Sequence, residues 1–130
     1  MKKCFILLLL ISGAMVSCKK TSVTYPIEGY WVGKYGSGTA APSSGYSMVV
    51  EPGGVLTIAD GSSITSSSKA TGTWTLTGNT FKATYTYSTP GGSTFSIQAT
   101  FSNDGKLTNG TWGSGASATG SGTWYMDRKN

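Results

Sequence analysis

The 130-residue chain contains no histidine, and its two cysteines, Cys4 and Cys18, lie within the first 18 positions. The rest of the chain therefore lacks thiols, disulfides, imidazole bases and any zinc site built from Cys and His. Serine–histidine and cysteine–histidine catalysis are excluded on the same ground. Ser, Thr and Gly make up about half of residues 21–130, a composition that disfavours helices and favours strands and turns.

Acidic residues are also scarce, and their positions do not suit catalysis. The chain has five of them. Asp60 and Asp104 precede glycines in expected turns, and Glu51 lies beside a Pro-Gly-Gly turn. A glycosidase needs two carboxylates that face one cleft about 5–10 Å apart, and a calcium loop needs closely spaced oxygen ligands. We therefore expect no enzymatic activity, no catalytic residue, no metal site and no cofactor.

Basic residues are concentrated at the start of the chain. The formal net charge is +5, but Lys2, Lys3, Lys19 and Lys20 supply four of the ten basic residues. From residue 27 onward, six basic residues stand against five acidic ones. A nucleic-acid-binding domain would show a clustered basic face. We therefore expect no nucleic-acid partner, and the sequence indicates no particular protein partner.

The N-terminus has the pattern of a targeting segment. It is basic at residues 1–3, apolar at 5–11 and rich in small residues at 12–17, which is the order of a secretory signal. The apolar stretch is too short for a transmembrane helix of about 20 residues. The sequence Met15-Val16-Ser17-Cys18 resembles the lipobox of bacterial lipoproteins. This resemblance implies cleavage before Cys18 and attachment of fatty acids such as palmitate to Cys18, which anchors the chain to a membrane.

The resemblance also implies a division of the chain and a location. It makes residues 1–17 the signal peptide, 18–26 the acylated cysteine and tether, and 27–130 the folded domain. Lys19 stands where an aspartate would retain such proteins in the inner membrane, which favours the outer membrane. The Ser-Cys-Lys-Lys start resembles lipoproteins of the Bacteroidetes, whose acidic surface-export signal is missing here, so we expect the periplasmic face. An ordinary signal with an incidental cysteine is the alternative.

After the targeting segment the sequence predicts one all-β domain. Apolar and polar residues alternate with a period of two, and turn residues separate the runs. We expect a single antiparallel up-and-down meander of eight strands with one dry and one wet face, closed into a barrel. A two-sheet β-sandwich shows the same alternation and is the alternative. The expected strands span residues 28–36, 45–51, 55–60, 70–77, 80–88, 93–102, 106–113 and 119–128.

Tight turns fix the expected register. The loop Gly78-Asn79 has glycine first, as a type II′ hairpin turn requires, and it pairs Leu76 with Phe81 and Trp74 with Ala83. A slip of one residue would turn every apolar side chain to the wrong face. Turns at 52–54 and 103–105 give the remaining expected pairs, which are Val50 with Leu56, Met48 with Ile58 and Phe101 with Leu107.

The expected loops alternate in length, so that all long loops lie at one end of the barrel and the tether enters at the other. Aromatic residues expected to point inward near the long-loop end are candidates for binding a small apolar or amphipathic ligand, because tyrosine combines an apolar face with a hydroxyl. A well-packed upper core is the alternative interpretation. The candidates are Tyr35, Tyr46, Tyr85, Tyr87, Phe95 and Trp112.

The Gly29-Tyr30-Trp31 sequence opens the first expected strand and resembles the lipocalin and calycin group, while the use of Gly, Thr and Trp resembles avidin-type barrels. The lipocalin resemblance implies a closed barrel that binds a small apolar molecule. It also implies that a basic residue near the end of the last strand, here Arg128, packs on Trp31. Gly-Thr-Trp triplets at 72–74, 110–112 and 122–124 either line a pocket or fill the core.

Two other functions fit the same sequence. A protein-binding module would insert the loops at 36–44 and 61–69 into a partner, as inhibitors of lysozyme-like enzymes do. A structural lipoprotein would have a filled barrel and no ligand.

Overall fold

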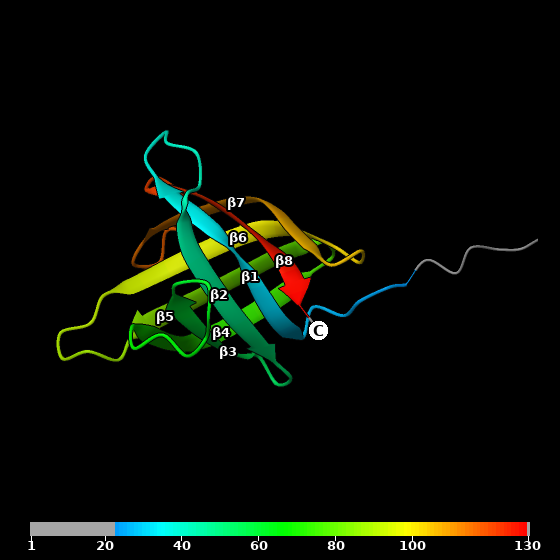
Figure 1. The fold of residues 1–130 in the computed structure, drawn as a ribbon, viewed down its shortest axis with the longest axis horizontal. Coiled ribbons are helices and arrows are strands. Elements are labelled where there is room, and N and C mark those ends of the chain that lie inside the picture. Colours follow the sequence, from blue (N-terminus) through cyan, green and yellow to red (C-terminus); the bar gives the residue numbers. More distant parts are fainter. Residues whose placement is uncertain (1–22, 130) are drawn as a thin grey trace, which may run out of the picture.

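Short antiparallel strands make up every regular element of residues 23–129, the part of the chain that this computed structural model describes. Each strand pairs with the next along the chain, and the last pairs with the first, so the sheet closes into an eight-stranded up-and-down barrel (Figure 1). The closed barrel is the expected fold, and the sandwich alternative is wrong. The strands are β1 (Gly29–Ser37), β2 (Ser44–Glu51), β3 (Val55–Asp60), β4 (Lys69–Thr77), β5 (Thr80–Tyr87), β6 (Thr94–Ser102), β7 (Lys106–Ser114) and β8 (Gly122–Lys129).

The expected strand boundaries agree with these within one residue, except at the start of β8. That strand begins at Gly122 instead of residue 119. Residues 115–121 fold back over β7 instead of extending β8: the Thr111 hydroxyl donates to the carbonyl oxygen of Ala118 at 2.8 Å, and the Ser121 amide donates to that of Trp112 at 3.0 Å. Residues 119–121, which the alternation assigns to a strand, therefore belong to a loop because that loop bonds to β7.

The expected register is confirmed at all three tight turns. Leu76 lies opposite Phe81 and Trp74 opposite Ala83. Gly78 has a φ of 59°, the left-handed conformation that the first position of a type II′ turn requires. The other expected pairs, Val50 with Leu56, Met48 with Ile58 and Phe101 with Leu107, are also formed.

A bulge in β7 keeps two expected core residues on the same face. Leu107 and Trp112 are five positions apart, so strict alternation would point one inward and the other outward. The pairing of β7 with β8 shifts between Leu107 and Gly110, and Asn109 within this interval has a φ of 52°. The extra residue resets the alternation, so that Leu107 is buried and Trp112 packs against the core.

Large side chains fill the middle of the barrel. Trp31, Phe81, Met48 and Leu56 are completely buried, as the period-two pattern predicts. Close strand contacts accompany this packing: a Cβ at Gly72 would lie 1.9 Å from the carbonyl oxygen of Thr84. Glycine at this inward position therefore lets β4 and β5 approach more closely than any other residue would allow.

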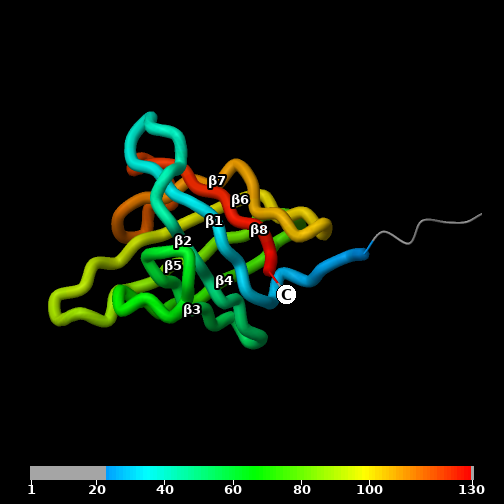
Figure 2. Tube along the Cα trace, viewed as in Figure 1, coloured from blue at the N-terminus to red at the C-terminus, as the bar shows by residue number. Residues whose placement is uncertain are grey.

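The two ends of the barrel differ, as expected. Tight turns close the end at which the N-terminal segment arrives, and the longer loops lie at the opposite end (Figures 1 and 2). The buried Ile27 lies on the closed end, where its carbonyl oxygen accepts a 2.9 Å hydrogen bond from the indole of Trp31. The described residues contain no helix long and apolar enough to cross a membrane.

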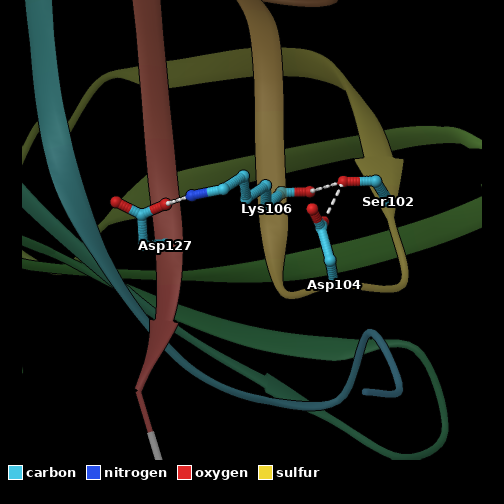
Figure 3. A network of polar contacts seen from close by, with 4 residues as sticks. All are labelled: Ser102, Asp104, Lys106 and Asp127. Atoms are coloured by element: carbon cyan, nitrogen blue, oxygen red, sulfur yellow. Dashed lines mark hydrogen bonds and ion pairs between the residues drawn. The ribbon is translucent and has the colours of Figure 1, made fainter. Parts of the chain in front are cut away.

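An exposed polar network connects β7 to β8 at the closed end (Figure 3). Lys106 Nζ lies 3.0 Å from Asp127 Oδ1, and this hydrogen-bonded ion pair raises the pKa of Lys106. The Ser102 hydroxyl donates to the Asp104 carboxylate at 2.5 Å within the neighbouring turn. Both partners of the ion pair are about half exposed, so it contributes little to stability.

Candidate functional site

A cavity of about 150 Å³ opens at the long-loop end of the barrel. Six aromatic side chains and the carboxylate of Asp60 line it. We call the six aromatic side chains the rim cluster; they are Tyr35, Tyr46, Tyr85, Tyr87, Phe95 and Trp112. All six residues that the sequence nominated for ligand binding therefore lie around one cavity.

The meander explains why residues from five strands meet here. The cluster draws on the end of β1, the start of β2, the end of β5, the start of β6 and the end of β7. In an up-and-down barrel these strand ends all lie at the same rim. Each residue also has the inward parity of its strand, which places its side chain within the barrel mouth.

The rim cluster forms an unbroken circuit of contacts. Tyr35 lies 5.4 Å from Tyr46 and 6.2 Å from Trp112, measured between ring centroids. Phe95 lies 5.8 Å from Trp112 and 5.9 Å from Tyr87, with ring planes at 70° and 85°. Tyr87 in turn lies 6.0 Å from Tyr85. These are favourable edge-to-face distances, so the rings hold one another in place.

The hydroxyls of Tyr46 and Tyr85 close the circuit at its buried base. They share a hydrogen bond with an oxygen–oxygen distance of 2.7 Å, and both side chains are about 95% buried. Burial raises the pKa of Tyr85 to about 12 and also raises that of Tyr46. Both hydroxyls are therefore neutral at physiological pH. Because one hydroxyl donates to the other, the second retains its own O–H group.

Asp60 places a carboxylate at the mouth of the cavity. Its Oδ1 accepts a 2.5 Å hydrogen bond from the Tyr87 hydroxyl, and its Oδ2 accepts a 3.2 Å bond from Ser68. Burial and the hydrogen bond to Asp60 raise the pKa of Tyr87 well above its usual value. Sequence reasoning treated Asp60 as a turn residue. Its parity with the inward-facing Leu56 and Ile58 was the signal that would have placed it inside.

The four tryptophans have separate roles. Trp112 alone among them lines the cavity, and its indole donates to the carbonyl oxygen of Gly36 at 2.9 Å. Trp31 and Trp124 are buried in the core, and Trp74 packs against it with its indole donating to the carbonyl oxygen of Glu51. The Gly-x-Trp repeats therefore fill the barrel more than they line a pocket.

Arg128 packs on a residue that the lipocalin resemblance did not indicate. Its guanidinium carbon lies 5.2 Å from the ring centroid of Tyr25, and Nε and Nη2 donate to the carbonyl oxygen of Glu28 at 3.3 and 3.1 Å. Trp31 is opposite Arg128 in register but completely buried. The segment before β1 crosses the closed end and brings Tyr25 to the guanidinium, a contact that the sequence did not indicate.

Gly29 has a specific part in this arrangement. A Cβ at this position would lie 2.7 Å from Arg128 Nη2, and the φ of Gly29 is 144°. Glycine therefore makes room for the guanidinium beside β1. The Gly29, Trp31 and Arg128 group lies at the end opposite the cavity and ties the N-terminal segment to β8.

A second hollow, on the outer face of β4, β5 and β6, has a different character. It has a volume of about 380 Å³, and hydroxyl side chains, Gln98 and Lys82 line most of it. Thr84 and Ser96 in this hollow bond each other at 2.8 Å, and Ser96 also donates to the carbonyl oxygen of Gly115 at 2.6 Å. The hydroxyls of Thr84 and Ser96 thus bond within the protein, and this hollow lacks the ring of aromatic walls that surrounds the rim cavity, which is therefore the better candidate site.

Within residues 23–129, no three His, Cys, Asp or Glu side chains are grouped to hold a metal ion. Cys18 and the expected signal peptide lie outside the described residues. Comparison of the chain with known protein families, with curated proteins and with solved structures finds no match. The functional argument therefore depends on the geometry of the rim cavity.

Proposed function

We propose that the protein is a membrane-anchored bacterial lipoprotein whose barrel binds one small apolar or amphipathic ligand at its long-loop end, without chemistry. The observation that supports this most is the rim cavity itself. Six aromatic side chains from five strands surround a hollow whose hydrogen-bonded polar groups include the Tyr46–Tyr85 hydroxyl pair and the Asp60 carboxylate. An apolar cavity with a few placed polar groups is typical of small-molecule sites.

The volume limits the size of the ligand. Pockets for drug-sized molecules enclose about 300–1,000 Å³, about two to seven times the 150 Å³ found here. An apolar cavity of about 150 Å³ engineered into another protein holds one benzene molecule. We therefore propose that the part of the ligand within the barrel is a single ring or a short branched alkyl group.

The location of the cavity fits an anchored protein. The N-terminal segment reaches the closed end, where the Tyr25 amide donates to the carbonyl oxygen of Asn103 at 2.7 Å. The residues that line the cavity lie at the opposite end, which carries the long loops. With the anchor at Cys18, we propose, the barrel sits on the periplasmic face of the outer membrane with its mouth accessible.

The test of ligand binding compares two tryptophans that differ in location. Trp112 and Trp74 are both half-buried, and each indole donates to a backbone carbonyl oxygen, but only Trp112 lines the cavity. We expect the neutral probe 4-methylphenol to shift the Trp112 indole resonance in an NMR titration. Trp112→Phe, in which binding is followed through the backbone amide resonances of Tyr87 and Phe95, should weaken the affinity for 4-methylphenol roughly fivefold, because part of one wall is lost.

Trp74→Phe is the matched control and should leave the affinity unchanged within about twofold. Urea unfolding of both variants shows whether they lose similar stability. If 4-methylphenol binds the parent and both variants equally, the ligand lies elsewhere. If neither 4-methylphenol nor benzyl alcohol perturbs Trp112 at millimolar concentration, the rim cavity does not bind a neutral aromatic ring.

A further inference from the structure

The rim cavity carries one carboxylate, that of Asp60, which forms no ion pair with any cationic side chain in residues 23–129. Asp60 is the only charged residue among those that line the cavity. Its two oxygens accept hydrogen bonds from the neutral hydroxyls of Tyr87 and Ser68. In the described part of the chain the one ion pair joins Lys106 to Asp127 near the closed end, far from this carboxylate along the barrel. The site thus has a carboxylate in need of a counter-charge.

The walls around this carboxylate are rich in π electrons. The rim cluster contains four tyrosines, a phenylalanine and a tryptophan, the ring types that attract cations through their faces. Neighbouring planes meet at 88° for Tyr35 with Trp112 and at 85° for Tyr87 with Phe95. Nearly perpendicular planes are the relation between adjacent walls of a box. Aromatic boxes with a nearby carboxylate are suited to quaternary and methylated ammonium groups.

The volume of the rim cavity and the few oxygen ligands it offers favour an organic cation over a metal ion. A trimethylammonium group has fewer heavy atoms than benzene, so it fits a cavity of about 150 Å³. A calcium ion takes six to eight oxygen ligands, whereas this cavity offers one carboxylate whose oxygens already accept two hydrogen bonds. An alkylammonium group needs no such coordination, because charge attraction and ring contact hold it.

We propose that the ligand of the rim cavity carries a small alkylated ammonium group, which the rim cluster encloses and Asp60 neutralises. This inference rests on the proposed ligand-binding function and adds the charge of the ligand to it. The base of the cavity is consistent with such an amphipathic ligand, because the Tyr46–Tyr85 pair keeps one O–H free to donate to a ligand oxygen.

The test uses two probes of equal shape and different charge. Choline and 3,3-dimethylbutan-1-ol differ in one central atom, nitrogen in the cation and carbon in the neutral alcohol. Each is titrated into the full chain in maltoside micelles, and the Trp112 indole resonance reports binding. We expect choline to bind roughly tenfold more tightly than the alcohol, and the preference to weaken as salt is added.

Asp60→Asn removes the charge, retains an oxygen acceptor for Tyr87 and keeps the side-chain shape. We expect it to abolish the preference for choline, so that the two probes bind with equal affinity. Asp104→Asn makes the same change of net charge at the exposed turn before β7, at the far end of the barrel, and should leave the preference intact.

Each other outcome has a distinct meaning. Equal binding of the two probes, or a preference that Asp60→Asn leaves unchanged, overturns the ammonium inference and leaves the proposed function standing. If 4-methylphenol or the alcohol binds but choline does not, the ammonium inference is likewise overturned and the proposed function stands. If no probe of either charge perturbs Trp112, the ammonium inference and the proposed function both fail.

Discussion

At the scale of single residues, the buried tyrosines distinguish the rim from the rest of the core. Tyr46 and Tyr85 satisfy each other through one hydrogen bond at 2.7 Å, so their burial leaves few unmade contacts. Tyr87 uses its hydroxyl to orient Asp60. The hydroxyls of these three tyrosines and the Asp60 carboxylate are thus held in fixed positions by one another, which is the preorganisation that a small ligand requires.

These tyrosines predict a loss of stability at alkaline pH. Burial raises the pKa of Tyr85 to about 12, whereas the unfolded residue ionises near pH 10. Its contribution to stability is therefore complete below about pH 10 and is lost as the pH rises towards 12. Each such tyrosine should lower the free energy of unfolding by about 1.4 kcal/mol per pH unit in this window.

Urea unfolding at pH 9, 10 and 11 measures this loss, and the absorbance of tyrosinate reports ionisation. The double variant Tyr46→Phe/Tyr85→Phe removes both partners of the hydrogen bond and leaves neither unsatisfied. We expect its stability to decline less steeply above pH 10 than that of the parent. Parallel declines would show that these two tyrosines do not carry the pH dependence.

At the scale of elements, the bulge in β7 decides which side chains reach the cavity. It lies between Leu107 and Gly110 in the pairing with β8, and without it Trp112 would point outward. Trp112 then contacts Tyr35 and Phe95 and hydrogen-bonds the carbonyl oxygen of Gly36 in β1. A local irregularity of one strand therefore completes the circuit of the rim cluster.

The bulge predicts that position 109 accepts glycine but not a β-branched residue. Asn109 adopts a φ of 52°, which a β-branched residue strongly disfavours and glycine readily accepts. Asn109→Val should lower the free energy of unfolding by about 1–3 kcal/mol, and Asn109→Gly should change it by less than about 0.5 kcal/mol. Urea unfolding measures both values.

Thr108→Val is the matched control, because it places the same side chain one residue earlier at another exposed position. It should alter stability by less than about 0.5 kcal/mol. A valine at position 109 that is as stable as one at 108 would mean that the left-handed conformation is not maintained in solution.

At the scale of the whole molecule, closure of the barrel separates two ends with different tasks. The closed end collects the N-terminal segment, Arg128 and the exposed network around Lys106 (Figure 3). The other end collects the long loops and the cavity. Because β8 pairs along β1, the sheet has no free edge that would recruit another chain. This polarity suits a domain that is tethered at one end and binds at the other.

The proposed anchor makes a direct prediction. When the full chain is produced in a Gram-negative host with radiolabelled palmitate, the label should appear in the parent protein and be lost in Cys18→Ser. Two or more acyl chains give durable membrane attachment, so the parent should sediment with membranes and Cys18→Ser should not. Cys4→Ser is the matched control and should retain the label, since residue 4 lies in the expected signal peptide. Labelling of Cys18→Ser would disprove the anchor.

The sequence by itself determined the all-β class, the number of strands and the register, because alternation and turn chemistry act over a few neighbouring residues. Gly78-Asn79 is sufficient to align β4 with β5. The same local rules placed the rim cluster at one end, since the parity of each aromatic residue and the order of the loops are both visible in the sequence.

Only the tertiary structure decided the features that depend on distant contacts. The late start of β8 follows from a loop that bonds to β7, and Arg128 meets Tyr25 because a segment about 100 residues earlier crosses the same end. Asp60 acquires its role when β5 brings the Tyr87 hydroxyl to its carboxylate. Local pattern fixes the face on which a side chain lies, whereas its partner is set by the closure of the whole barrel.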